Sequence, residues 1–411
     1  MIEAIKTKNF RKTDISVFSL KSIPLWIRLV LLIWVFAAVF ADQLANELPL
    51  TCKIDGERHF PAIAESIAKI RGDASVRLKY RGKADRMESI VRTPIPYSPQ
   101  TIDRNNTGFV SPFENQNITD WRQRHWLGTD RLGRDIMAGM VHGARVAFVV
   151  GMLAVFFAFI IGVPLGAAAG YYGDRGIFLS GLALLLMTFL FLMWMYLFYL
   201  QMMGAAVSGF IVWLPFLLAV FLPFLLKKSQ LGALVNKLPG FLSRSFPIPL
   251  DLILLRLIEI FRSLPNLFIL LALLAVFGQT GMTTIALILA LLMWPTFARY
   301  TRAEFLSLRE KEFVSAARLF RKNDFRIIFT DILPNAKAPL IVISAFGISA
   351  AILAESTLSF LGLGLGIDQV SWGSMLSEAR RYFPAWWMAV FPGLAIFIII
   401  YALNSLGDKV R

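Results

Sequence analysis

The sequence predicts an all-α protein that crosses a membrane several times. Of its 411 residues, 57% are hydrophobic and only 17% are charged, which is too apolar for a soluble globular chain. Predominantly apolar runs of roughly 18 residues or more recur along the chain, and such a run can cross a hydrocarbon core of about 30 Å. The composition therefore favours a polytopic membrane protein and excludes a multidomain soluble enzyme.

Eight apolar segments are the expected spans. They cover 23–41, 144–172, 177–202, 205–226, 252–277, 283–300, 336–354 and 386–402. The N-terminal residues 1–22 are basic, so the positive-inside rule places them in the cytoplasm. Crossings then alternate, which puts 42–140 (the outer segment) outside, the loop 303–336 inside and the C-terminus in the cytoplasm. Within the outer segment we expect a helix over 58–72 and a strand over 74–82.

Composition also bears on cofactors and partners. Cys52 is the single cysteine and the three histidines show no ligand spacing, so neither a disulfide framework nor a metal site is expected. The formal net charge is +15. In a membrane protein, basic loops set topology and meet anionic headgroups, so we expect lipid as a partner and no nucleic acid.

A charged stretch, EFVSAARLFRKNDFRIIFTDILPN over 312–335 (the elbow), lies between the sixth and seventh segments. Its pattern predicts two short helices, the second capped by Asn323 or Asp324 and ended by Pro334. The apolar faces of these helices are formed by Phe313, Ala316, Ala317, Phe320, Phe325, Ile328, Phe329 and Ile332. The residues alone leave two interpretations open, burial of the apolar side in lipid or docking to a cytoplasmic partner.

The elbow resembles the cytoplasmic signature loop of ABC importer permeases, in which Glu-Ala-Ala is followed by Gly and later by Leu-Pro. The matching residues are Ala316, Ala317, Leu333 and Pro334. Ser315 replaces the usual Glu, and Arg321 replaces the Gly that permits a turn with positive φ. Asn323 tolerates that conformation, so we expect it to take the turn instead.

Five further motifs occur in order along the chain. They are HWLGTDRLGRDIMAGMVHGARVA (125–147), RLIEIFRSLP (256–265), AESTLSFLGLGLG (354–366), SWGSMLSEAR (371–380) and FPGLAIFIIIYALNSLGD (391–408). They resemble the permeases of the dipeptide and oligopeptide (peptide/nickel) importer family, over about 125–175 and 250–411. The resemblance implies an ABC importer type I permease fold over 141–411. Its six-span core would carry an insertion at 176–248, with two extra spans and a basic cytoplasmic linker.

The resemblance also implies partners. The chain has no G-x-x-x-x-G-K-[ST] loop, so it is expected to bind no cofactor directly, to catalyse no reaction and to rely on ATP used by two separate ATPase subunits. A homologous second permease chain and an extracytoplasmic solute-binding protein complete the expected importer in a bacterial cytoplasmic membrane. Residues expected to dock the ATPase are Glu312, Phe313, Ala316, Ala317, Arg318, Phe320, Arg321, Leu333 and Pro334.

Polar or small residues in the late spans are candidates for the substrate path. They are Ser344, Ser349, Glu355, Ser356, Thr357 and Ser359. Glu355 is the sharpest of them, because a carboxylate near membrane depth is costly and usually faces a cavity or a partner. A hydrogen-bonded turn residue is the other interpretation of Glu355, and both stay open.

The sequence leaves two alternative functions open. The permease of a nickel importer carries closely similar motifs. A membrane anchor or receptor scaffold would bind an external ligand through the outer segment without transport. Co-purification with an ATPase separates transport from the scaffold, and the ligand of the partner binding protein separates peptide from nickel.

Overall fold

The structure, a computed structural model, describes residues 23–410 apart from 72–74, 83–86, 119, 175, 204–210, 220–239, 241–243, 279–280 and 367–368. Two compact units divide the chain. The first comprises 1–163, 261–300 and 333–411, and the second comprises 164–260 and 301–332.

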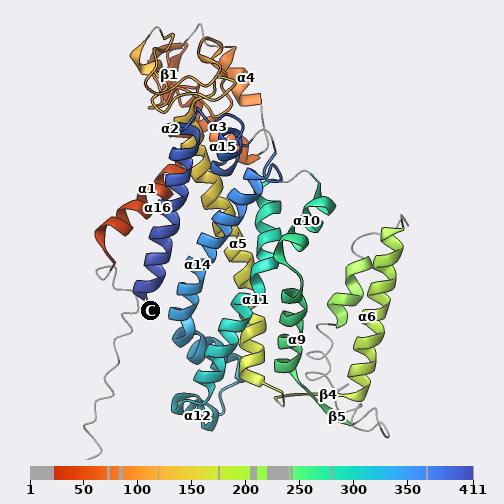
Figure 1. Ribbon diagram of the computed structural model, residues 1–411. Coiled ribbons are helices and arrows are strands. Elements are labelled where there is room, and N and C mark those ends of the chain that lie inside the picture. Colours follow the sequence, from red (N-terminus) through yellow and green to blue (C-terminus); the bar gives the residue numbers. More distant parts are fainter. Residues whose placement is uncertain are drawn as a thin grey trace, which may run out of the picture. The chain divides into compact units, whose positions relative to one another are not determined.

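The first unit is built on helices, shown in Figure 1. They are α1 (Leu25–Val39), α2 (Ala41–Leu44), the first part of α5 (Ile136–Tyr172), α10 (Asn266–Phe277), most of α11 (Met282–Arg309), α14 (Leu333–Phe360), α15 (Trp372–Ala379) and α16 (Trp387–Val410). α14 packs along α16 and against α15, while α1 packs along α16. A Cβ at Gly347 of α14 would lie 3.0 Å from Val155 and 3.4 Å from Phe297. Such small residues let membrane helices approach closely and associate through packing.

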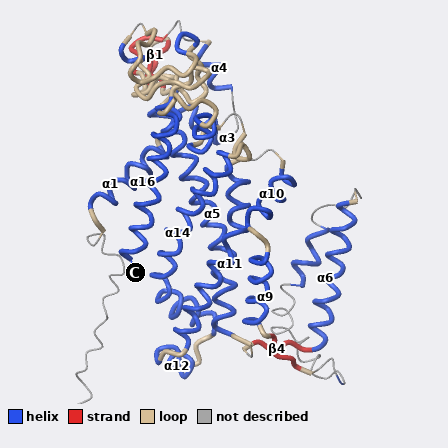
Figure 2. The backbone as a smooth tube through the Cα atoms, viewed as in Figure 1, coloured by secondary structure: helices blue, strands red, loops and turns tan. Residues whose placement is uncertain are grey.

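The outer segment adds a small mixed fold to this unit. Its sheet has the order β2-β1-β3, with β1 (Thr51–Ile54) antiparallel to both β2 (Glu57–His59) and β3 (Met87–Val91). The predicted helix is confirmed as α3 (Pro61–Arg71), but the predicted strand over 74–82 is wrong, because Ser75–Arg81 forms the helix α4. Leu, Lys and Arg, which occur in that run, have high helix propensity, and this preference favours a helix over the expected strand. Figure 2 shows how much of the rest of the segment is loop.

A buried histidine ties the outer segment to the first turn of α5. His125 is fully buried, with Nδ1 2.8 Å from Asp135 Oδ1 and Nε2 3.2 Å from Asp103 Oδ2. Asp135 Oδ2 accepts a hydrogen bond from the backbone N–H of Ala138 at 2.7 Å, which caps α5. Burial alone would lower the pKa of His125, but the two carboxylates outweigh it and raise the pKa above its ordinary value.

A second buried ion network joins the end of α1 to α5. Asp42 is 2% exposed, and its carboxylate lies 2.6 Å from Arg145 Nη1 and 2.7 Å from Lys69 Nζ. Arg145 Nε also donates to the carbonyl of Ala38 at 2.9 Å. Burial would raise the pKa of Asp42, but the two cations hold it well below its usual range. The outer segment is therefore fastened to two helices by paired charges.

The second unit contains both ends of the predicted insertion. Its elements are the last part of α5, β4 (Ile177–Ser180), α6 (Gly181–Met202), β5 (Ser245–Ile248), most of α9 (Leu250–Ser263), the end of α11, α12 (Glu312–Leu319), α13 (Asp324–Arg326) and the π-helix η7 (Ile327–Ile332). The strands β4 and β5 pair antiparallel, from Ile177 opposite Ile248 to Ser180 opposite Ser245. The chain therefore enters the insertion through β4 and leaves it through β5, and these two strands pair with each other.

The described residues confirm a polytopic helical membrane protein. Five helices are long and apolar enough to cross a membrane, namely α5, α6, α11, the run Asp324–Phe360 that includes α14, and α16. The fifth predicted span is bent by 83° between α9 and α10, where Pro265 precedes α10 and cannot continue α9. With that pair as one span the count reaches six, against eight predicted. α1 has only 15 residues, and much of 205–226 lies outside the described residues.

Candidate functional site

The elbow folds into two helical pieces joined by a tight turn. α12 ends at Leu319, and Asn323 Oδ1 then accepts from the backbone N–H of Phe325 at 3.4 Å to cap the second piece, as predicted. The turn prediction was wrong, since Arg321 has the positive φ of 53° and Asn323 has φ −67°. Arg321 thus adopts the conformation for which the resembling loop uses Gly, although a side chain makes that conformation costly.

The second piece of the elbow does not stop where the sequence predicts. Pro334 was expected to end it, but η7 runs directly into α14, so Pro334 lies in the first turn of that helix. Proline has no N–H to donate, and it directly follows the wider π-turns of η7, where the regular α-helical hydrogen-bond ladder is already interrupted. The elbow is therefore continuous with a membrane-spanning helix.

Large apolar side chains cover the exposed side of the elbow. Leu319 is 85% exposed, Phe320 83% and Phe325 65%. Val314 is fully buried and Ala317 is 6% exposed, so these two face the protein interior. The predicted apolar faces therefore split, because Ala317, Ile328 and Ile332 point inward while the phenylalanines are exposed. An exposed apolar patch of this kind marks a surface for lipid or protein.

Polar contacts fix the elbow to the end of α5. Tyr171 Oη donates to Asp324 Oδ1 at 2.8 Å, and the Arg318 guanidinium lies over the Tyr171 ring, 5.4 Å from its centroid. Arg309, the last residue of α11, donates from Nη1 to the carbonyl of Gly170 at 3.2 Å. A Cβ at Gly170 would lie 2.6 Å from Phe305 Cβ, so no larger residue fits there. The elbow and the end of α11 are thereby held against the end of α5.

The predicted docking residues are only partly on the elbow surface. Those exposed are Glu312, Phe313, Ala316, Arg318, Phe320, Arg321 and Pro334, while Leu333 is half-buried and Ala317 is buried. Leu319, Phe325 and Phe329 are exposed as well but were not in the predicted set. The sequence could have indicated their exposure, because large apolar residues lie close to charged residues in this stretch.

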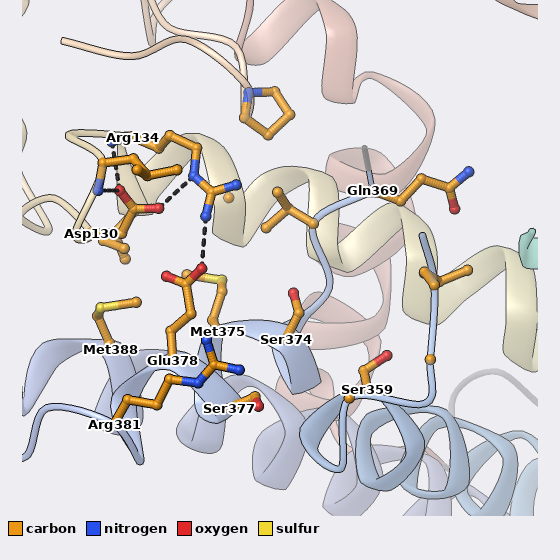
Figure 3. Close-up of a pocket in the computed structure, with 18 of the residues that line it drawn as sticks. Asp130, Arg134, Ser359, Gln369, Ser374, Met375, Ser377, Glu378, Arg381 and Met388 are labelled. Carbon is orange, nitrogen blue, oxygen red and sulfur yellow. Dashed lines mark hydrogen bonds and ion pairs between the residues drawn. The ribbon is translucent and has the colours of Figure 1, made fainter. Parts of the chain in front are cut away.

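A pocket of about 330 Å³ opens where the outer segment meets the ends of α14 and α16 (Figure 3). Its polar wall is an ion chain, in which Arg134 Nε lies 2.5 Å from Asp130 and Arg134 Nη2 lies 2.8 Å from Glu378 Oε1. Burial and the Asp130 charge raise the pKa of Glu378 above its ordinary value, although Arg134 opposes them. The exposed Arg381 also lines this Arg134 pocket. The sequence motifs contained Asp130, Arg134 and Glu378, with Arg381 directly after the motif that contains Glu378, but their spacing gave no sign that they meet.

A buried carboxylate lies just behind this pocket. Glu355 is 1% exposed, and its two oxygens accept from Ser359 Oγ at 2.7 Å and Ser356 Oγ at 3.4 Å. The loop 361–366 folds onto the same helix end, because a Cβ at Gly364 would lie 2.1 Å from Ser359 Oγ. Of the predicted path residues, only Ser359 lines the Arg134 pocket.

The remaining path candidates bond to their own helix. The hydroxyls of Ser344, Ser349 and Thr357 donate to carbonyls four residues earlier, at 2.7, 3.1 and 2.7 Å. Thr357 is exposed, Ser344 is half-buried and Ser349 is buried. The structure thus brings Glu355, Ser356 and Ser359 together and leaves these three apart from them.

Comparison with known proteins places a polytopic helical chain with this elbow among transport permeases. Residues 231–410 match the family described as binding-protein-dependent transport system inner membrane component. The dipeptide transport system permease protein DppC of Alkalihalophilus pseudofirmus is 30% identical over 288 residues, 70% of this chain and 70% of the relative. The di/tripeptide transport system permease protein DppC of Pseudomonas aeruginosa is 29% identical over 70% of this chain and 71% of its own. The chain belongs to this permease family.

Among solved structures, an inward-facing form of the MetNI methionine ABC transporter is similar at a TM-score of 0.40 and 14% identity. It covers 67% of this chain and 98% of the MetNI chain.

Proposed function

We propose that this chain is a membrane-spanning subunit of a peptide importer that is driven by separate ATPase subunits. The family membership and the peptide permeases at about 30% identity support this proposal. The observation that carries it is the elbow, whose exposed Leu319, Phe320 and Phe325 lie on a helix pair fixed to α5 and continuous with α14. Such a surface suits a cleft in a partner that moves.

In this proposal the chain catalyses no reaction and binds no cofactor, because ATP is bound and hydrolysed in two partner subunits. A homologous second permease chain completes the pathway, and an extracytoplasmic solute-binding protein delivers the peptide. The exposed charges of Glu312, Arg318 and Arg321 would orient the elbow in its cleft, since charges at the rim of an interface fix register more than affinity. ATP binding would select between two arrangements of the spans.

The substrate path would run between the two permease chains, past the ends of α14 and α15. Glu355, Ser356 and Ser359 are its best candidates because they cluster behind the Arg134 pocket. A buried carboxylate that accepts from two hydroxyls can hold the loop 361–366 in place or, when the loop moves, meet a peptide ammonium.

A pair of matched variants tests the docking role of the elbow. Phe320→Ser removes an exposed aromatic ring from the elbow, and Phe113→Ser removes one of equal exposure, 82%, from the outer segment. With the partner subunits co-expressed, we expect Phe320→Ser to lose about tenfold or more of ATPase co-purification and peptide uptake, as truncation of a central interface residue does. Phe113→Ser should retain both. Equal behaviour of the two variants would refute the docking role.

Orientation needs its own measurement. The outer segment is proposed to face outward and the elbow inward, with both termini in the cytoplasm. Cys52 is 2% exposed and unsuited to labelling, so the test uses Asn105→Cys and Lys311→Cys in a Cys52→Ala background, both positions being exposed. A membrane-impermeant maleimide should label Asn105→Cys in intact spheroplasts and Lys311→Cys only after permeabilisation. The reverse pattern would place the elbow away from any cytoplasmic ATPase.

A further inference from the structure

A second cavity, of about 470 Å³, lies within the outer segment and has no part in the sites above. One wall is the end of β3 and the residues after it, including Val91, Arg92 and Pro94, and the other is the 3₁₀ helix η5 (Trp121–Gln123) with Trp126. We call it the Arg–Trp pocket. Flat apolar rings and arginines on facing walls suit a ligand that is both apolar and anionic.

The charge of the Arg–Trp pocket is one-sided. Among the described residues, Arg92 and Arg122 are the only charged ones that line it, and no described carboxylate does. Both are exposed, and in the part of the chain that the structure describes neither guanidinium has an ion-pair partner. The Arg134 pocket differs, because its arginine is held between two carboxylates. The Arg–Trp pocket therefore offers two uncompensated guanidinium groups, which bind carboxylates well.

The aromatic wall is exposed but held in place. Trp121 is 68% exposed and Trp126 55% exposed, and each lies beside an arginine, with Arg122 and Arg124 at 5.8 and 5.7 Å from the ring centroids. Tyr97 Oη donates to the carbonyl of Gln123 at 2.6 Å, which fixes this wall to the opposite one. Exposed rings on a preformed frame are typical of binding sites.

The facing wall is fixed by the backbone. Thr93 Oγ1 donates to the carbonyl of Asn46 at 2.7 Å, and the N–H of Ile95 donates to the carbonyl of Leu44 at 2.9 Å. Both walls are thus fixed to the rest of the outer segment, so the pocket is already formed before a ligand binds. Binding would therefore cost little conformational entropy of the protein.

The edge of the sheet beside the pocket favours an extended ligand. β3 lies at the edge of its sheet, and its last residues Ile90 and Val91 are 46% and 55% exposed. The carbonyl of Val91 accepts from the N–H of Leu50 on the β1 side at 2.8 Å. β3 carries a bulge just before this end, because its register against β1 shifts and Ser89 has a φ of 50°. An extended peptide can add to such an edge through its backbone.

We propose that the Arg–Trp pocket binds the C-terminal end of an extended oligopeptide, with the terminal carboxylate on Arg92 and Arg122 and a side chain against Trp121 and Trp126. This rests on the proposed peptide substrate and the outward orientation, and it adds a peptide site on the permease itself. Peptide held there would be concentrated beside the importer, apart from any path through the spans.

Photo-crosslinking on the purified full chain in phosphatidylcholine nanodiscs tests the site. The probe is a pentapeptide with benzoylphenylalanine as its penultimate residue, made with a free carboxylate and as the C-terminal amide. Mass spectrometry should place crosslinks in 90–96 and 121–126, and the amide should give about tenfold to a hundredfold less, because a charge-assisted pair is lost. Crosslinks elsewhere, or equal labelling by the amide, would overturn the proposal.

Matched variants separate the pocket from general charge. Arg92→Gln with Arg122→Gln should lower crosslinking as the amide does, and Trp121→Ala should lower it for both probes. Arg104→Gln, an exposed arginine of the same segment outside the pocket, should leave it unchanged. Loss of crosslinking in nanodiscs containing phosphatidylglycerol would identify a lipid headgroup site and overturn the peptide site. Because binding is measured on the isolated chain, a wild type that imports peptide but does not crosslink sinks only this inference.

Discussion

The elbow and the outer segment differ in which side chains they expose and which they bury. The elbow turns Leu319 and Phe320 outward, at 85% and 83% exposed, whereas the outer segment buries charge, with Asp42 at 2% and His125 fully buried. Exposed apolar rings on a short anchored helix leave a surface for lipid or protein to cover. Buried, paired charges instead fix one arrangement, because removal of either partner strands the other. The elbow is built to be covered and the outer segment to hold its shape unaided.

The largest expected effect separates the two sides of the elbow itself. Ala317 is buried and its neighbour Ala316 is exposed. Ala317→Asp buries an unpaired carboxylate at a cost of at least about 2 kcal/mol, so it should unfold the elbow and abolish peptide uptake. Ala316→Asp should leave the fold intact and weaken only ATPase co-purification. Limited proteolysis at the elbow and uptake in a strain lacking other importers measure both.

If Ala316→Asp exposes the elbow to protease as readily as Ala317→Asp, the inward and outward sides are not distinct. The elbow would then not have one side that packs inward and another that is left for a partner, as the comparison with the outer segment assumes.

The outer segment is expected to lose stability with rising pH through His125. Its folded pKa is raised above an unfolded value of about 6.5, so its stabilising contribution is complete below that pH and is lost as pH rises through the folded pKa. His125→Gln should lower stability by about 3–5 kcal/mol at pH 6, because Asp103 and Asp135 lose the cation between them. The variant's melting temperature, followed by tryptophan fluorescence, should then vary less with pH than that of the wild type.

His59→Gln is the matched control in the same segment. His59 is half-buried and contacts the ring of Tyr80, and in the described part of the chain it has no carboxylate partner. It should keep the wild-type pH dependence. A wild type whose melting temperature is flat between pH 6 and 9 would show that the His125 cluster does not hold the segment.

The sequence predicted what periodicity and local chemistry decide. Apolar length identified five of the eight expected spans and a sixth as a bent pair, and the Asn323 cap follows from the side-chain chemistry at the start of a helix. The bend at Pro265 and the passage of Pro334 into α14 were missed, because a proline ends one helix as readily as it begins the next.

Contacts between distant segments could not be predicted. Arg134 and Glu378 are separated by 244 positions, and Tyr171 and Asp324 by 153, so nothing in either neighbourhood announces the other. The positive φ of Arg321 was also missed, since the preference of Asn for that conformation is only a tendency and the turn was settled by where α12 ends. Local rules gave the parts of the elbow, and packing decided which residues face outward.

The smallest expected effect concerns α6, which we expect to face lipid. Only 11% of its apolar window is buried, against 50% for α5, and its residues are apolar on all sides, as a lipid-facing helix requires. β4 and β5 bring Ser180 opposite Ser245, so residues 181–244 can be replaced by Asn-Gly, which closes a two-residue hairpin. That deletion should leave ATPase co-purification unchanged and retain peptide uptake. Loss of uptake from a chain that still inserts and binds the ATPase would make α6 a third functional surface, exposed like the elbow but essential within the membrane.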